Sequence, residues 1–291
     1  KFLIQPDEST IDEGIELLQS SNNNHLFEMI LDGCSISNDG DIIPNKLFKG
    51  TKKTQPFLDY AILSLIHLLP SDINIPESLK KRNISKIRLE YSEASSVSGK
   101  IFDRISSYQN LSMITLSNLT EIKNLDGLKN CVNLKEISIR NCTQLQNLDG
   151  LINCVNLEEI YLGRCDKLQN LGGLINCMSL EHISLSICDQ LQNLDELINC
   201  ITINKLGIYN CGEVQNLDGL KNCVNLKEIS IMNCTRLQNL DGLENCINLE
   251  EIYIDECREL QNLDGLINCV NLDKITIESC DQLQNLDGLI N

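Results

Sequence analysis

The chain has 291 residues, a formal net charge of −17 from 41 acidic and 24 basic residues, and 15 cysteines. This acidity opposes non-specific binding to nucleic acid or anionic membranes, although it also serves simply to keep a repetitive protein soluble. No apolar run approaches the roughly 18–20 residues that a membrane-spanning helix needs, so we expect no membrane span.

Residues 1–100 hold irregularly spaced apolar segments. Residues 9–20 predict an amphipathic helix, 26–31 and 58–63 are candidate strands, and 84–89 belong to a longer unit that ends in a strand. Because the first unit of a repeat array must present a polar outer face, it is expected to be atypical. We therefore expect 1–100 to be an irregular N-terminal cap with degenerate repeats, and a separate small helical domain is the alternative.

Residues 101–291 repeat every 23 residues without insertion or deletion. Seven full repeats, numbered here 1 to 7, occupy 124–284, with repeat 1 at 124–146 and a related unit before it at 101–123. The last repeat is truncated at Asn291. A fixed period of this length predicts a solenoid, in which each unit buries its apolar face against its neighbours.

The first half of each repeat predicts a short helix or a 3-10 turn. In repeat 1, Leu125, Leu128 and Cys131 lie three residues apart, which gives such a turn one apolar face. We expect Asp126 to cap the turn through its carboxylate and the following glycine to let the chain bend. Asn124 and its equivalents are expected to bond the turn backbone.

The second half of each repeat predicts a short strand. Ile137 and Ile139 alternate with the polar residues Ser138 and Arg140, which is the two-residue period of a half-buried strand. β-Branched residues also favour this conformation.

Fourteen of the cysteines follow the same period. They lack the short paired spacing of zinc sites, and disulfides between stacked repeats would leave an odd cysteine in each column. We expect buried, reduced thiols that act as small hydrophobes, which indicates an intracellular, cytoplasmic location. The two columns are Cys131, Cys154, Cys177, Cys200, Cys223, Cys246 and Cys269, and Cys142, Cys165, Cys188, Cys211, Cys234, Cys257 and Cys280.

The pattern LxxIxIxxCxxL, from Leu134 to Leu145, resembles the leucine-rich repeat family. The neighbouring NCxNL, from Asn130 to Leu134, is similar to the treponemal-type (BspA-like) subclass, although that subclass usually has Phe at the slot of Leu128. The resemblance implies an α/β solenoid, a horseshoe or arc with a parallel concave β-sheet and short helical or 3-10 turns on the convex side. It also implies protein–protein recognition, usually through the concave face.

The strand residues that flank the two inward positions are expected to form that concave surface. They vary from repeat to repeat while the framework stays fixed, and three of the six tyrosines fall among them, although β-propensity alone would also place tyrosine in strands. Their carboxylates suit a protein partner with a basic patch. The candidate partner-binding residues are Glu136, Ser138, Arg140, Glu159, Tyr161, His182, Ser184, Lys205, Tyr209, Glu228, Met232, Glu251, Tyr253, Asp255, Lys274 and Glu278.

Catalytic and metal signatures are weak. The three histidines are far apart in sequence, His182 stands on the concave face with serines and no orienting carboxylate, and no phosphate-binding loop is present. The recurring aspartates lack the GGxGxD spacing of calcium-binding repeats. We therefore expect no enzyme, metal or cofactor, but a protein-recognition module. The alternatives are a structural scaffold of a larger complex and a substrate-receptor subunit of a ubiquitin ligase.

Two further features concern how the array grew and how it ends. Repeats 1 and 5, 2 and 6, and 3 and 7 resemble one another, which indicates duplication of a block of four repeats, or 92 residues.

Residues 285–291 supply half a unit but no closing strand. Because exposed strand edges invite pairing, we expect the natural chain to continue past Asn291, and end-to-end packing is the alternative.

Overall fold

The computed structural model describes residues 34–36, 42–44, 86–90, 105 and 110–290. The chain forms two compact units, Lys1–Leu89 and Glu90–Asn291. In the first unit, β1 (Cys34–Ile36) pairs antiparallel with β2 (Ile42–Pro44). The strand β3 (Lys86–Glu90) ends at the first residue of the second unit and overlaps the strand expected at 84–89.

Several expectations for the N-terminal part lie outside the described residues. These are the helix over 9–20, the strands at 26–31 and 58–63, and the boundary between residues 100 and 101. They stay predictions.

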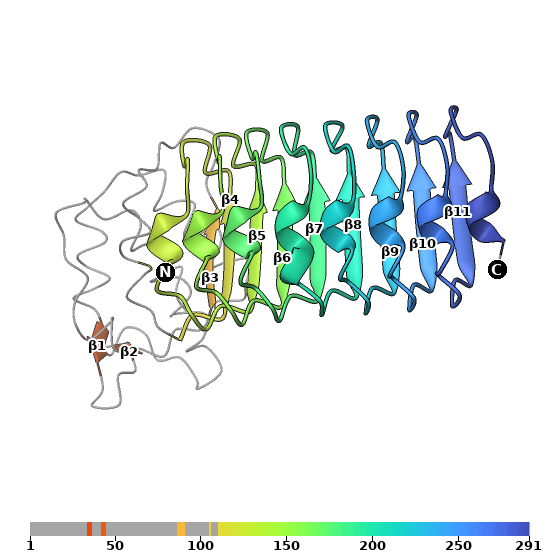
Figure 1. Cartoon of the computed structure of the whole chain (residues 1–291). Coiled ribbons are helices and arrows are strands. Elements are labelled where there is room, and N and C mark those ends of the chain that lie inside the picture. Colours follow the sequence, from red (N-terminus) through yellow and green to blue (C-terminus); the bar gives the residue numbers. More distant parts are fainter. Residues whose placement is uncertain (1–33, 37–41, 45–85, 91–104, 106–109, 291) are drawn as a thin grey trace. The chain divides into compact units, whose positions relative to one another are not determined.

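The second unit is built on a parallel sheet with one strand from each repeat (Figure 1). Each strand pairs with the next in a register shifted by one repeat, so that Ile137 lies beside Ile160 and Ile139 beside Leu162. Because the register never slips, each slot of the repeat becomes a straight column across the sheet. The strands are β4 (Met113–Ser117), β5 (Glu136–Arg140), β6 (Glu159–Gly163), β7 (His182–Ser186), β8 (Lys205–Tyr209), β9 (Glu228–Met232), β10 (Glu251–Asp255) and β11 (Lys274–Glu278).

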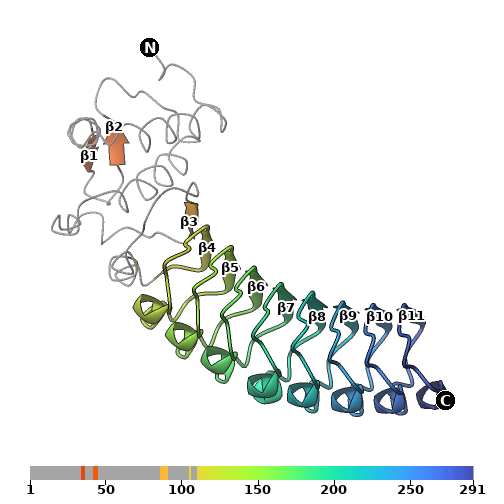
Figure 2. The same cartoon turned by 90° about the horizontal axis from the view of Figure 1, so that it is seen from above.

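Short 3-10 helices occupy the opposite side of the array. Figure 2 shows the sheet on the inner, concave side of the curved array and the helices on its outer, convex side. The expected arc of parallel strands and 3-10 turns is confirmed. The helices are η1 (Asp126–Leu128), η2 (Asp149–Leu151), η3 (Gly172–Leu174), η4 (Asp195–Asn199), η5 (Asp218–Leu220), η6 (Asp241–Leu243), η7 (Asp264–Leu266) and η8 (Asp287–Leu289).

The core is a stack of identical layers between the sheet and the helices. In repeat 1, Leu125, Leu128, Leu134, Ile137 and Ile139 are fully buried, and the same slots are buried in repeats 2 to 6. In repeat 7, whose layer has no complete neighbour after it, Ile275 is 41% exposed. Burying a large apolar side chain contributes about 1.5–3 kcal/mol, so each layer gains stability only when a neighbour covers it.

The cysteine columns are part of this core. All fourteen are free thiols, and all except the half-exposed Cys280 are buried. Their sulfurs donate weak hydrogen bonds to nearby carbonyls, as from Cys154 Sγ to the Cys131 oxygen at 3.5 Å. The expectation of buried, reduced thiols is confirmed, and neither column forms a disulfide.

The expected capping of the convex turns by aspartate is wrong. In the described helices η1 to η8, no side chain at the N-cap makes a capping bond, and the N-cap is a leucine in each case. Instead, Asn124 Oδ1 accepts the backbone N–H of Asp126 at 3.2 Å, an Asx turn repeated along the array. The aspartate side chains are exposed, and Asp126 forms an ion pair with Lys129.

The recurring glycine of the convex turn serves close packing rather than bending. A Cβ added at Gly150 would lie 1.8 Å from the carbonyl oxygen of Leu125 in the preceding repeat. The same overlap exists at Gly173, Gly219 and Gly242. Glycine therefore sets how closely successive turns approach on the convex side.

The turn that follows each strand requires a left-handed residue. Asn141, Asn210 and Asn233 have φ values of 53°, 56° and 52°, a conformation that asparagine tolerates. Ile187 occupies the same slot with a φ of 55°, which is unfavourable for a β-branched side chain. One turn in the middle of the array is thus strained.

Candidate functional site

The structure places the predicted partner-binding residues on the concave side of β5 to β11. They form three columns, made by the first, middle and last residue of each strand. Most are half-buried or exposed, but Ser138 is only 8% exposed and offers little surface to a partner.

Tyr161 is the centre of a polar cluster on β6 and β7. Its hydroxyl donates to Glu159 Oε2 at 2.5 Å and lies 3.3 Å from His182 Nδ1. The two rings meet edge to face with centroids 5.2 Å apart. Burial, helped by the bond to Glu159 and the charge of Glu136, raises the pKa of Tyr161 to about 12. The hydroxyl therefore stays protonated and keeps donating at neutral pH.

The sequence predicted no carboxylate placed to orient His182, and the group that the structure places on its ring is the Tyr161 hydroxyl, 3.3 Å from Nδ1. Glu159 and His182 are register partners on neighbouring strands, and Tyr161 links them through its hydroxyl. The 23-residue spacing from Glu159 to His182 was the signal in the sequence, since equivalent slots must lie side by side in a parallel solenoid.

In the middle of the face, an ion pair neutralises one lysine and a tyrosine ring covers a glycine. Lys205 Nζ forms an ion pair with Glu228 Oε2 at 2.6 Å. A Cβ added at Gly207 would lie 2.5 Å from the Tyr209 ring, so this ring lies over the glycine and buries it. Tyr209 presents the aromatic surface of β8.

A second tyrosine cluster lies on β10 and β11. The pKa of Tyr253 is raised by burial and by the negative charges of Asp255 and Glu278. Asp255 Oδ1 is buried and finds no hydrogen-bond donor within the described part of the chain. Lys274 Nζ neutralises Glu251 at 2.9 Å. This end of the face therefore keeps unneutralised carboxylate charge beside an aromatic ring.

The thiols whose pKa is raised by burial are poorly suited to nucleophilic chemistry, whereas the hydrogen bond with Cys188 lowers the pKa of Cys211. Burial raises the pKa of Cys131 to about 11 and that of Cys177 to about 12, so the reactive thiolate is scarce at neutral pH. Over residues 34–36, 42–44, 86–90 and 110–290, we find no group of three or more histidine, cysteine or carboxylate residues placed to hold a metal ion. No helix in the same ranges is long and apolar enough to cross a membrane.

Comparisons with known proteins agree with this architecture. Residues 204–287 match the family model of the leucine-rich repeat domain of the endo-β-N-acetylglucosaminidase EndoS. The leucine-rich repeat domain of the type III effector XopL aligns with a TM-score of 0.54 and 18% identity over 69% of this chain and 70% of that one. Internalin C2 from Listeria monocytogenes aligns with a TM-score of 0.53 and 17% identity over 67% of this chain and 80% of that one. No curated protein sequence matches the chain.

These likenesses concern the fold, and none of them addresses the treponemal-type subclass, which stays a prediction. Leucine-rich repeat solenoids generally present an extended concave surface for protein–protein interaction. With its parallel concave sheet, its convex 3-10 turns and its matched repeats, the described array is a leucine-rich repeat solenoid.

Proposed function

We propose that this chain is a non-enzymatic recognition module that binds a protein with a basic patch through the concave face of β5 to β11. The observation that carries the proposal is the contrast between framework and face. The inward columns hold almost the same apolar residues in every repeat, whereas the concave columns change in charge, size and aromaticity.

The two tyrosine clusters support this proposal. Tyrosine is enriched among residues that dominate binding energy, because it combines a large apolar ring with a hydrogen-bonding hydroxyl. Tyr161 lies beside Glu159 and Glu136, and Tyr253 lies beside Asp255 and Glu278. A lysine or arginine side chain would meet a ring face and carboxylate oxygens at either cluster.

The test compares two triple variants in binding measurements with proteins captured from a lysate of the source cells and then purified. Tyr161→Ala/Tyr209→Ala/Tyr253→Ala should weaken binding at least about a hundredfold, since single hot-spot truncations cost 2 kcal/mol or more. The matched control, Asp149→Ala/Asp195→Ala/Asp241→Ala, changes exposed residues on the convex turns and should leave affinity unchanged.

Salt provides an independent readout. Affinity for a basic partner should fall as ionic strength rises, because exposed charges are screened. Equal binding by the parent and the tyrosine variant would exclude the concave face and favour the scaffold alternative, in which the ends and flanks of the array make the contacts.

A further inference from the structure

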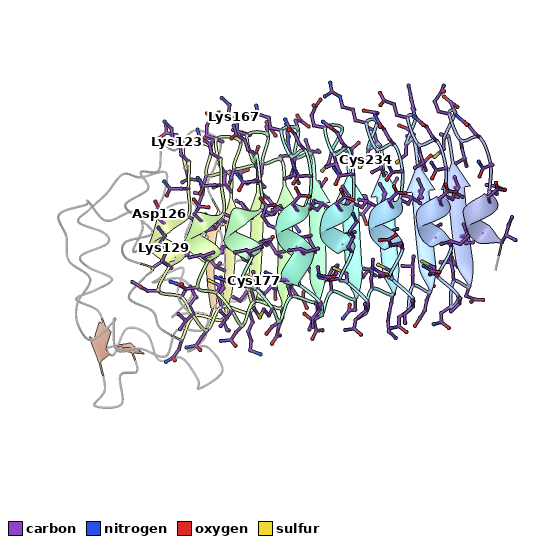
Figure 3. All side chains as sticks on the ribbon, in the orientation of Figure 1. Lys123, Asp126, Lys129, Lys167, Cys177 and Cys234 are labelled. Atoms are coloured by element: carbon purple, nitrogen blue, oxygen red, sulfur yellow. The ribbon has the colours of Figure 1, made fainter. Side chains whose placement is uncertain are left out.

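One flank of the array carries an exposed apolar column. It lies on the loops that run from each convex helix to the following strand, and Figure 3 labels Cys177 on one of these loops, below the helices. In each repeat, the residue that follows the cysteine of the column from Cys131 to Cys269 is apolar and is between 41% and 70% exposed. The members are Val132, Val155, Met178, Ile201, Val224, Ile247 and Val270.

The column widens in the middle of the array. Three residues before it stand Ile152, Ile175 and Ile198 in the consecutive repeats 2 to 4, all half-exposed, and Ile267 in repeat 7, which is 46% exposed. Repeats 1, 5 and 6 have Lys129, Lys221 and Glu244 at this slot. A contiguous apolar patch of this kind marks an interaction surface.

The polar groups that border the patch are already satisfied. The Asn156 side-chain amide donates to the carbonyl of Val132 at 3.0 Å, and the Asn153 amide donates to Lys129 at 3.1 Å. Asn225 and Asn248 repeat the first of these bonds with Ile201 and Val224. Covering the flank would therefore not leave these amides unpaired, which is the main cost of burying polar groups.

The charges beside the patch, although Lys135 pairs with Glu158 and Lys227 with Glu250 within one chain, are also complementary to those of a second, antiparallel copy. At the slot just before each strand, repeats 1 to 6 carry Lys135, Glu158, Glu181, Asn204, Lys227 and Glu250. When the series is read in reverse and set against itself, repeat 1 pairs with repeat 6, repeat 2 with repeat 5 and repeat 3 with repeat 4. Each pair of two charged residues then joins a lysine to a glutamate, and the third pair joins Glu181 to Asn204. A second copy, laid antiparallel on the same flank, would thus place Lys135 opposite Glu250 and Glu158 opposite Lys227.

Shifting the second copy by one repeat in either direction breaks this charge complementarity. A shift by one repeat in one direction sets Glu158 opposite Glu250, and in the other direction it sets Lys135 opposite Lys227. The complementary register also places Lys129 opposite Glu244. Its two-fold axis passes between repeats 3 and 4, where Ile175, Met178, Ile198 and Ile201 form the widest part of the patch.

We propose that two copies of this chain associate along this flank as an antiparallel, two-fold symmetric dimer in which repeat 1 faces repeat 6, repeat 2 faces repeat 5 and repeat 3 faces repeat 4. A two-fold interface brings the same patch of both copies together, as this self-complementary pattern requires. The axis runs from the convex to the concave side, so both concave faces open in the same direction and form one wider surface.

The first test is sedimentation velocity of the full chain over a range of concentrations. We expect a monomer–dimer equilibrium for the parent. Ile201→Asp lies next to the axis and occurs twice in the dimer, so it should raise the dissociation constant at least about a hundredfold. Val270→Asp makes the same change in repeat 7, beyond the six repeats whose charges pair and at the end of the interface, and should raise the dissociation constant much less. A parent that stays monomeric at every concentration, or equal losses from both variants, would overturn the proposal.

The second test is a charge swap that does not depend on the core. Lys227→Glu alone should weaken the dimer about tenfold by placing two carboxylates together, and Lys227→Glu/Glu158→Lys should restore it. The two residues are three strand spacings apart within one chain, about 14 Å, and their partners in the same chain are Glu250 and Lys135. Rescue can therefore arise only between copies, and failure of the double variant to recover would contradict this register.

Discussion

The two blocks of the array, repeats 1 to 4 (124–215) and repeats 5 to 7 (216–284), share one pattern but differ in how tightly their layers close. In the second block, Gly219, Gly242 and Gly265 each lie directly under a leucine carbonyl of the preceding repeat. In the first block the equivalent slot of repeat 4 is Glu196, whose Oε2 accepts the Leu171 backbone N–H at 3.4 Å. In the first block, the convex turns of repeats 3 and 4 thus meet at a junction made by a side chain instead of by close backbone contact.

Other departures gather at the same junction. Gly172 replaces the usual aspartate of the turn that faces Glu196, and the strained Ile187 lies in the same repeat as Gly172. The helix of repeat 4, η4, spans five residues where those of the other repeats span three. The comparison teaches that glycine in this slot fixes the distance between convex turns, and that another residue is accepted only where neighbouring positions change with it.

The largest expected effect comes from adding a methyl group at a closed junction. Gly242→Ala would place a Cβ 1.9 Å from the Leu217 carbonyl oxygen and should lower the free energy of unfolding by about 3 kcal/mol or more. Glu196→Ala, at the same slot in the open junction, should cost less than about 1 kcal/mol. Urea unfolding measures both, and equal losses would show that glycine does not set the spacing.

Exchanging asparagine and isoleucine at the left-handed turn after the strand should change the free energy of unfolding in opposite directions in the two blocks. Asn233→Ile puts a β-branched residue at a φ of 52° and should lower the free energy of unfolding by about 1–2 kcal/mol. Ile187→Asn relieves the same strain and should raise it by about 1 kcal/mol. Thermal unfolding of both variants checks the signs, and a loss from Ile187→Asn would refute the strain.

A smaller effect concerns the side chain that holds the open junction. Glu196→Leu removes the acceptor of the Leu171 N–H and should lower the free energy of unfolding by about 0.5 kcal/mol, because the bond is long. Glu196→Gln keeps an acceptor and is the matched control. Faster amide exchange at Leu171 in the leucine variant alone would localise the change, and unchanged exchange would argue against the bond.

The last prediction concerns the pKa of Tyr161 in the first block, whose hydroxyl is bonded to Glu159, whereas no such bond contributes to the pKa of its counterpart Tyr253. The pKa of Tyr161 is raised from an unfolded value of 10.0 to about 12, so the folded state holds this proton more tightly. Its contribution to stability is complete below pH 10 and is lost as the pH rises through 12. The tyrosinate absorbance of the parent minus that of Tyr161→Phe should titrate near pH 12, and titration near pH 10 would contradict the buried bond to Glu159.

Periodicity was sufficient to predict most of the fold. A 23-residue repeat without insertions aligns every slot, so the buried columns led by Leu125, Ile137 and Cys131, and the three concave columns, follow from counting alone. The placement of Tyr161, Tyr209 and Tyr253 on one face follows from the alternation of residues in a strand.

The features that the repeat period did not predict depend on contacts between neighbouring repeats. The expected bond from Asn124 to the turn backbone is confirmed, but the expected aspartate cap is wrong, and the glycine is needed for close packing rather than for bending. The link from Glu159 through Tyr161 to His182 also required the strands to be laid side by side.

The sequence by itself determined the repeat, the identity of each column and the side of the sheet on which each column lies, because one fixed period admits one register. The tertiary structure alone decided the spacing of the convex turns, the shielding of Ser138 and Gly207, and the ion pairs that neutralise part of the concave face. These depend on distances between neighbouring repeats, and a pattern within a single repeat contains no such distances.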